Sequence, residues 1–201
     1  MTPARSRTKG MTLVELTVGM VMLSVIALAV AGLTASLSDA YAGGERFYTS
    51  LQMARVSMLR IETEARKAKE FLSDDASSEA AIALWADDAN HDGKVNLSEI
   101  VLYWYQSGTG NLVRQQLVFP PANQTLDYAL EKDSLSDVNM VVMLMWWFSP
   151  YLQEAELCEN VSSCRFVTDQ APPDTKVLSI RMTVGQTGKE VQLQTAASLE
   201  R

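Results

Sequence analysis

Apolar residues are concentrated in one N-terminal stretch of this 201-residue chain, and a longer region of mixed polarity follows it. Residues 16–37 contain no charged side chain. As an α-helix, this stretch would extend about 33 Å, which exceeds the roughly 30 Å hydrocarbon core of a membrane. With its flanking residues, the stretch predicts a membrane-spanning helix over residues 11–38.

Charged residues are distributed unevenly around the apolar stretch. Arg5, Arg7 and Lys9 precede it, and residues 1–10 contain no acidic side chain. The positive-inside rule therefore predicts that residues 1–10 lie in the cytoplasm and the bulk of the chain lies beyond the membrane. Glu15 lies at the N-terminal edge of the stretch, where a carboxylate costs about 2–3 kcal/mol unless it reaches the headgroups or a partner.

Helical spacing of apolar residues continues beyond the membrane segment. An amphipathic helix is predicted over residues 39–71, with Gly43-Gly44 as the point where it could loosen or kink. Its apolar face repeats every three or four residues, and charged residues occupy the other faces. The residues of the apolar face are Phe47, Leu51, Ala54, Met58, Ile61, Ala65 and Ala68.

Residues 72–201 form the predicted globular region, and their pattern shifts towards the shorter period of β-strands. The apolar run 140–148 is too short to cross a membrane, so we interpret it as a buried strand, with a partner-facing strand as the alternative. Turns are expected at residues 107–110 and 185–188. The order of elements predicts an α+β fold in which a long N-terminal helix packs on an antiparallel sheet. Strands are predicted over residues 80–86, 100–106, 112–119, 140–148, 165–168, 176–184 and 190–195.

The charge balance bears on the partners of the chain. Residues 1–10 hold three of the 17 basic residues and none of the 24 acidic ones, so the rest of the chain has 14 basic side chains and a net charge of −10. Binding to a nucleic-acid backbone requires clustered Lys and Arg. We therefore expect no nucleic-acid partner.

The two cysteines, Cys158 and Cys164, are separated by five residues in a polar segment. In an extracytoplasmic compartment they are expected to form a disulfide that closes a short loop, and two free thiols are the alternative. A zinc site is not expected, because there is no second cysteine pair and the single histidine, His91, is far away in sequence.

Residues 88–99 fit the twelve-residue EF-hand loop at every specified position. Calcium takes six to eight oxygen ligands, alternate side chains of such a loop supply them, and Gly93 permits the sharp turn. Because residues 81–85 and 100–105 have strand character, we expect a structural clip between two strands. The alternative is a polar turn that binds no ion. The predicted ligands of one calcium ion are Asp88, Asn90, Asp92, the carbonyl of Lys94, Asn96 and Glu99.

Catalytic motifs are not evident in the sequence. The single histidine lies inside the calcium-loop pattern, which disfavours most Ser–His and Cys–His schemes. There is no glycine-rich phosphate loop. The chain is therefore not expected to be an enzyme.

The run Lys9-Gly10-Met11-Thr12-Leu13-Val14-Glu15 resembles the N-terminus of type IV prepilins and type II secretion pseudopilins. The resemblance implies that a prepilin peptidase cuts between Gly10 and Met11 and methylates the new amine of Met11. It also implies that Glu15 pairs with the Met11 amine of a neighbouring subunit during assembly. Most members of the family have Phe where this chain has Met11.

The resemblance further implies a structural subunit, most similar to a minor pseudopilin, in the cytoplasmic (inner) membrane with a periplasmic C-terminal domain. Its partners would be other pilin or pseudopilin subunits and, indirectly, an assembly platform and a cytoplasmic ATPase. Pilins often carry a disulfide-bounded loop near the C-terminus. Other interpretations stay open. Ala40-Tyr41-Ala42 looks like a signal-peptidase site, and an uncleaved signal anchor is a further option. The chain could also be a membrane-anchored or secreted calcium-binding adhesion module, or a DNA-uptake pilin, which the acidic charge disfavours.

Overall fold

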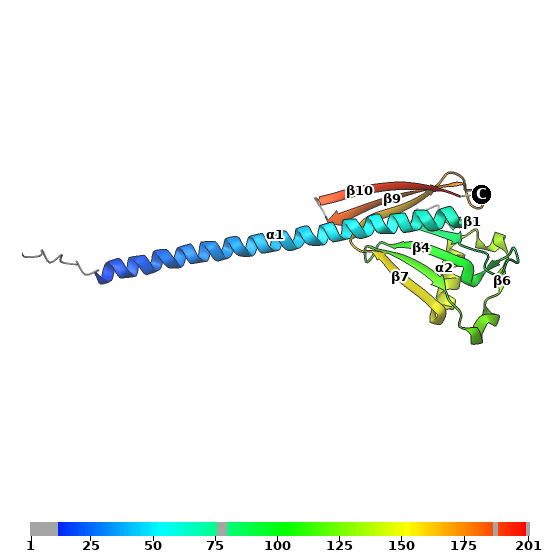
Figure 1. Ribbon diagram of the computed structural model, residues 1–201, viewed down its shortest axis with the longest axis horizontal. Helices are drawn as coiled ribbons and strands as arrows, with labels where there is room; N and C mark the ends of the chain where they lie inside the picture. The colour runs from blue at the N-terminus through cyan, green and yellow to red at the C-terminus, as the bar shows by residue number, and fades with distance from the viewer. Residues whose placement is uncertain (1–11, 76–79, 187–188, 200–201) are drawn as a thin grey trace, which may run out of the picture. The chain divides into compact units, whose positions relative to one another are not determined.

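The computed structural model describes residues 12–75, 80–186 and 189–199 (Figure 1). These residues divide into two compact units, Met1–Arg46 and Phe47–Arg201, and each unit is described by itself. The described part of the first unit is Thr12 and the N-terminal part of helix α1. The second unit contains the rest of α1, two larger antiparallel β-sheets and a second α-helix, so the predicted α+β class with a long helix packed on antiparallel strands is confirmed.

Helix α1 extends over Leu13–Lys67 and is longer than the rest of the helical structure combined. It continues through Gly43 and Gly44, so the glycine pair does not end it. Arg66 and Lys67 lie in its last turn, where positive charge interacts favourably with the helix dipole. The helix ends four residues before the predicted end at residue 71, because Glu70 already begins strand β1.

The second half of α1 packs on the sheets through the predicted apolar face. Ala54, Met58, Ile61 and Ala65 are buried in one core with side chains from both larger sheets. Polar contacts also hold the same half in place. The Ser57 hydroxyl donates to the carbonyl of Leu157 (2.6 Å), and the Thr195 hydroxyl donates to Glu62 Oε2 (2.7 Å).

The strands form three antiparallel sheets. The largest has the order β1-β2-β4-β5-β7, the second has the order β10-β9-β8, and β3 pairs with β6. The strands of the largest sheet are β1 (Glu70–Asp74), β2 (Ala81–Trp85), β4 (Ile100–Gln106), β5 (Asn111–Leu117) and β7 (Leu152–Cys158). The others are β8 (Val161–Thr168), β9 (Val177–Gln186), β10 (Lys189–Ser198), β3 (Val95–Asn96) and β6 (Ala129–Leu130).

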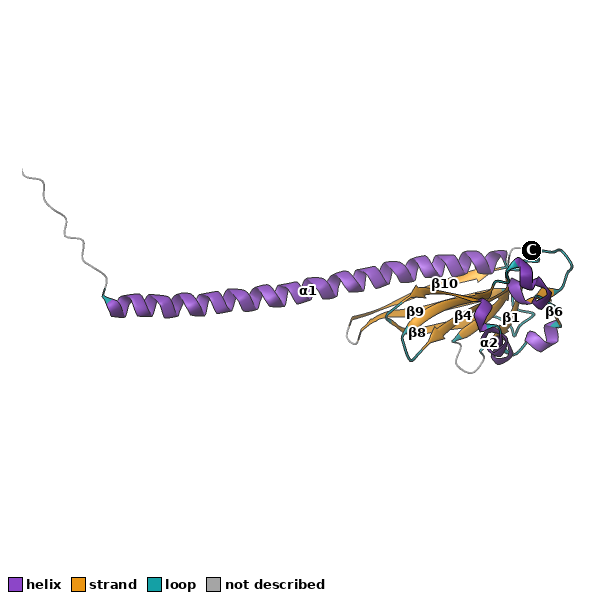
Figure 2. Ribbon diagram, turned by 90° about the horizontal axis from the view of Figure 1, so that it is seen from below, coloured by secondary structure: helices purple, strands orange, loops and turns teal. Residues whose placement is uncertain are grey.

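Both faces of the five-stranded sheet are covered. Strand β2 illustrates this, because all five of its residues are buried. Ile82 and Leu84 lie in the core shared with α1, whereas Ala83 and Trp85 lie in a second core on the other face. The second core is closed by helix α2 (Val138–Trp147) and by short 3-10 turns (Figures 1 and 2). These turns are η1 (Leu97–Glu99), η3 (Lys132–Leu135) and η4 (Ser149–Tyr151), whereas η2 (Pro121–Leu126) has no buried residue.

The prediction of a strand over residues 140–148 was wrong, because this run is helix α2. Asp137 caps the helix by accepting a hydrogen bond from the backbone N–H of Asn139 (2.9 Å). The buried positions recur at helical spacing, and an apolar run of this length has no periodicity of hydrophobicity that separates helix from strand. The buried residues of α2 are Val138, Val141, Leu144 and Met145.

Strands β1 and β7 and the two-residue strands β3 and β6 were not predicted. Strand β1 begins at Glu70 and extends to Asp74, where the sequence analysis assigns no strand. Strand β7 forms an edge of the five-stranded sheet and carries Glu154 and Glu156, which are exposed. Charged residues are common on edge strands because they oppose pairing with other chains, and they lower the apparent strand propensity of the sequence.

Candidate functional site

Glu15 lies in the first turn of α1 and is hydrogen-bonded to Thr12. Its Oε2 atom accepts from the backbone N–H of Thr12 (2.9 Å) and from the Thr12 hydroxyl (3.0 Å), and the Glu15 N–H donates to Thr12 Oγ1 (3.3 Å). This reciprocal arrangement is a capping box, which satisfies donors that a helix N-terminus otherwise leaves free. The other predicted residues of this site, Gly10 and Met11, lie outside the described residues.

The helix surface that follows Glu15 is apolar and exposed. Every large apolar side chain from Leu16 to Leu37 exposes half of its surface or more. It belongs to the one helix among the described residues that is long and apolar enough to cross a membrane. Such a surface requires a cover of lipid or of other apolar helices.

The few polar side chains of this segment are satisfied within the helix. Thr17, Ser24, Thr34 and Ser36 each donate to a backbone carbonyl three or four residues earlier, at 2.8–3.0 Å. Such bonds remove the cost of placing a hydroxyl in an environment without water. The segment is therefore suited to a membrane despite its hydroxyl groups.

The predicted calcium ligands Asp88, Asn90 and Asp92 lie together in one tight loop. Asp88 accepts hydrogen bonds from the backbone N–H groups of Asp92 (3.1 Å) and Gly93 (3.2 Å), and Asn90 also accepts from Asp92 (3.0 Å). Gly93 has a φ of 72°, a left-handed conformation that favours glycine. The backbone therefore turns where the calcium-loop pattern requires it.

Glu99, the predicted closing ligand, points into the protein. Its carboxylate accepts hydrogen bonds from Trp85 Nε1 (3.1 Å) and from the backbone N–H groups of Ala89 (2.9 Å) and Asn96 (3.1 Å). Within the described ranges, no three His, Cys, Asp or Glu side chains gather closely enough to hold a metal. The donor types and the turn fit calcium, but the Glu99 carboxylate is not gathered with the others, so calcium binding stays a prediction.

The predicted disulfide between Cys158 and Cys164 is absent from the structure, where both are buried free thiols. Cys158 ends β7 and Cys164 lies in β8, so the two residues belong to different sheets that share one core. Burial and the charges of Glu159 and Glu156 raise the pKa of Cys158 to about 11. Burial and the charge of Cys158 raise the pKa of Cys164 to about 12.

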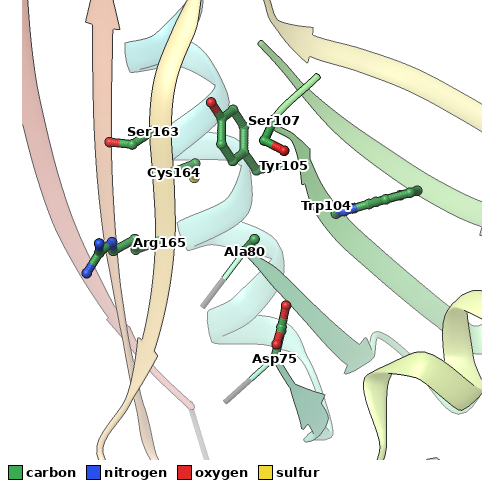
Figure 3. Close-up of a pocket in the computed structure, with 8 residues that line it drawn as sticks. All are labelled: Asp75, Ala80, Trp104, Tyr105, Ser107, Ser163, Cys164 and Arg165. Atoms are coloured by element: carbon green, nitrogen blue, oxygen red, sulfur yellow. The ribbon is translucent and has the colours of Figure 1, made fainter. Parts of the chain in front are cut away.

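A pocket of about 290 Å³ lies beside β4 and β8 (Figure 3). Figure 3 shows Trp104 and Arg165 pointing away from each other, so these two large side chains do not converge on one point. The Tyr105 hydroxyl is engaged, because it donates to the carbonyls of Val161 (3.0 Å) and Ser162 (2.9 Å). The pocket is lined by Asp75, Ala80, Trp104, Tyr105, Ser107, Ser163, Cys164 and Arg165.

Comparison with known families identifies the N-terminal segment. Residues 5–31 match the family model described as the prokaryotic N-terminal methylation motif, and this range includes Gly10, Met11 and Glu15. This match supports the resemblance of the N-terminal segment to type IV pilin-like and pseudopilin proteins. The comparison with curated proteins found no match. Together, the motif and the apolar helix are consistent with a single-pass anchor in the inner membrane.

Proposed function

We propose that this protein is a structural subunit, of the minor pseudopilin kind, in a type II secretion pseudopilus or a type IV pilus-like filament. One observation carries the proposal: the methylation motif leads directly into a long helix whose apolar surface is exposed over residues 16–37. In the membrane lipid covers that surface, and in a filament the same surface packs against the helices of other subunits. A single segment thereby serves both as anchor and as filament core.

Processing at the motif would produce the assembling form. A prepilin peptidase cuts between Gly10 and Met11 and methylates Met11, and an assembly platform driven by a cytoplasmic ATPase then extracts the subunit. The Glu15 carboxylate pairs with the Met11 amine of a neighbouring subunit. In the structure this carboxylate accepts hydrogen bonds from Thr12, the residue that follows Met11 in the sequence.

The N-terminal residue and the intact mass of protein purified from its native membrane test the processing step. We expect a chain that begins with N-methylated Met11. A chain that begins at Gly43 would indicate cleavage by signal peptidase and a secreted protein, and an intact Met1 would indicate a plain anchor. Either result would overturn the proposal. Residues 40–42 lie inside α1, which does not favour the signal-peptidase alternative.

Filament incorporation tests the role of Glu15. We expect Glu15→Ala to reduce the fraction of subunits in sheared filaments at least tenfold, while the membrane fraction keeps the processed protein. Thr12→Ala is the matched control, since it removes the cap but keeps the carboxylate and costs about 1 kcal/mol of local helix stability. If both variants reduce filament incorporation equally, the capping box acts through helix folding. The proposed pairing of Glu15 with the Met11 amine would then be contradicted.

We also propose that residues 88–99 bind one calcium ion as a structural clip. Asp88, Asn90 and Asp92 supply side-chain oxygens, and Glu99 completes the set if its carboxylate turns from Trp85 towards the loop. The support is the spacing of these residues and the left-handed Gly93. Bound calcium would supply positive charge to the acidic loop and join the segments on either side of it.

A further inference from the structure

Helix α2 has two apolar faces, and only one of them is used by the fold. The residues of the inner face pack on the five-stranded sheet. We call the opposite, exposed side of the helix the α2 face. It consists of Met140 (37% exposed), Met143 (38%), Trp146 (72%) and Trp147 (63%). Their spacing places them on one side of the helix.

The α2 face has the composition of a protein-binding surface. At up to about 250 Å² for each whole indole side chain, Trp146 and Trp147 alone expose roughly 300 Å², and single apolar patches of this size are often functional. Trp and Met are enriched in the cores of protein interfaces, and Trp is the most frequent hot-spot residue. The fold itself gains little from these side chains, because they contact solvent.

The chain on either side of α2 in the sequence is acidic, and η3, which carries Asp133, contacts α2. Between residues 127 and 156 the chain has one basic residue, Lys132, and its ammonium is paired with Glu70 (2.5 Å). The cap of α2 is itself the acidic residue Asp137. The acidic residues of this region are Asp127, Glu131, Asp133, Asp137, Glu154 and Glu156.

We propose that the α2 face docks a protein segment that is apolar at its centre and carries Lys or Arg at its flanks. The apolar centre covers the two indoles, and the basic flanks pair with acidic residues of the segments beside α2. The same charges disfavour the two other occupants. Anionic lipid headgroups are repelled, and a second copy of this chain would bring an identical acidic surface. The inference does not depend on filament assembly.

Binding of designed peptides to the full chain tests this inference. The chain is placed in phosphatidylcholine nanodiscs, and two fluorescent, Trp-free helical peptides share one apolar centre but carry either Lys or Glu at both flanks. We expect the Lys peptide to bind at least tenfold more tightly than the Glu peptide, and added salt to reduce the difference. The double variant Trp146→Ser, Trp147→Ser should lower the affinity of the chain for the Lys peptide at least tenfold.

The control is Val56→Ser with Leu59→Ser, which removes two similarly exposed apolar side chains from α1. It should leave the affinity for the Lys peptide unchanged. Equal binding of both peptides, or equal losses in the two double variants, would overturn the inference. Quenching of Trp146 and Trp147 emission by brominated lipids would assign the face to the bilayer. A dimer that the tryptophan variant abolishes would assign it to a second copy.

Discussion

At the scale of single residues, Glu15 shows how local chemistry prepares a functional group. A carboxylate beside an apolar helix has to be stabilised before assembly, and the Thr12 cap does this with two hydrogen bonds. The sequence identified Glu15 through its spacing from Gly10. The bond to Thr12 could have been predicted as well, because Thr followed three residues later by Glu is the pattern of a capping box.

Cys158 and Cys164 permit a residue-scale prediction. Because both thiols are buried and have raised pKa values of about 11 and about 12, neither should react with N-ethylmaleimide in the folded protein at pH 8. Intact mass after labelling is the measurement. We expect no added label in buffer and two added labels in denaturant without a reductant.

If labels appear only after reduction, the two cysteines form the disulfide that the sequence predicted and are not the free thiols of this structure. Labelling of the folded protein would contradict the burial of the two thiols. The sequence could not decide between a disulfide and two free thiols. Five intervening residues allow a short disulfide loop, and they equally allow the two cysteines to lie in strands of different sheets.

At the scale of elements, a partly buried polar cluster fastens α1 to the five-stranded sheet. Glu64 Oε2 accepts hydrogen bonds from the Tyr103 hydroxyl (2.5 Å) and from Arg114 Nε (2.9 Å), and Arg60 Nε donates to Glu64 Oε1 (3.1 Å). Burial raises the pKa of Glu64, but the bonds from Tyr103, Arg114 and Arg60 outweigh it, and the net pKa is lowered. Burial and the Glu64 charge raise the pKa of Tyr103.

The cluster predicts a loss of stability in acid. A lowered pKa in the folded state means that Glu64 stabilises the protein fully above its ordinary pKa of 4.5, and that this contribution is lost as the pH falls through the folded-state pKa. We expect Glu64→Gln to lower the free energy of unfolding by about 1–3 kcal/mol at pH 7 and by less at pH 3. Urea unfolding at the two pH values is the measurement.

The control is Glu131→Gln, which changes an exposed glutamate of the same unit. It should change the free energy of unfolding by less than about 0.5 kcal/mol at either pH. A loss from Glu64→Gln that is equal at pH 7 and pH 3 would show that packing, and not the charge of Glu64, holds α1 on the sheet.

The elements differ in how far the sequence determined them. Helix α1 and the hairpins could be predicted, because a long uncharged run, a 3.6-residue period and glycine turns are local signals. Helix α2 could not, because residues 140–148 are apolar throughout and the side facing solvent carries tryptophan instead of charge. Its helical form depends on the Asp137 cap and on a sheet face that needs cover.

At the scale of the whole molecule, calcium binding would act on the stability of the entire globular unit. The loop of residues 88–99 lies between β2 and β4 and includes β3 and η1. An ion bound only in the folded state adds about 2.7 kcal/mol when its free concentration is a hundred times the dissociation constant. For a chain of this size we therefore expect the Tm in saturating calcium to exceed the Tm in chelator by about 5–10 °C.

Asp88→Ala should abolish that difference in Tm. The absolute Tm is a poor guide, because Asp88 also accepts hydrogen bonds from Asp92 and Gly93, so its loss destabilises the loop without any ion. Only the difference between the Tm in calcium and the Tm in chelator measures the effect of the ion. Asp87→Asn, one residue away and outside the predicted ligand set, should retain this difference in Tm. If the natural chain has the same Tm in calcium and in chelator, the loop is a polar turn that binds no ion. The role of Glu99 is then only to accept hydrogen bonds from Trp85 and the backbone.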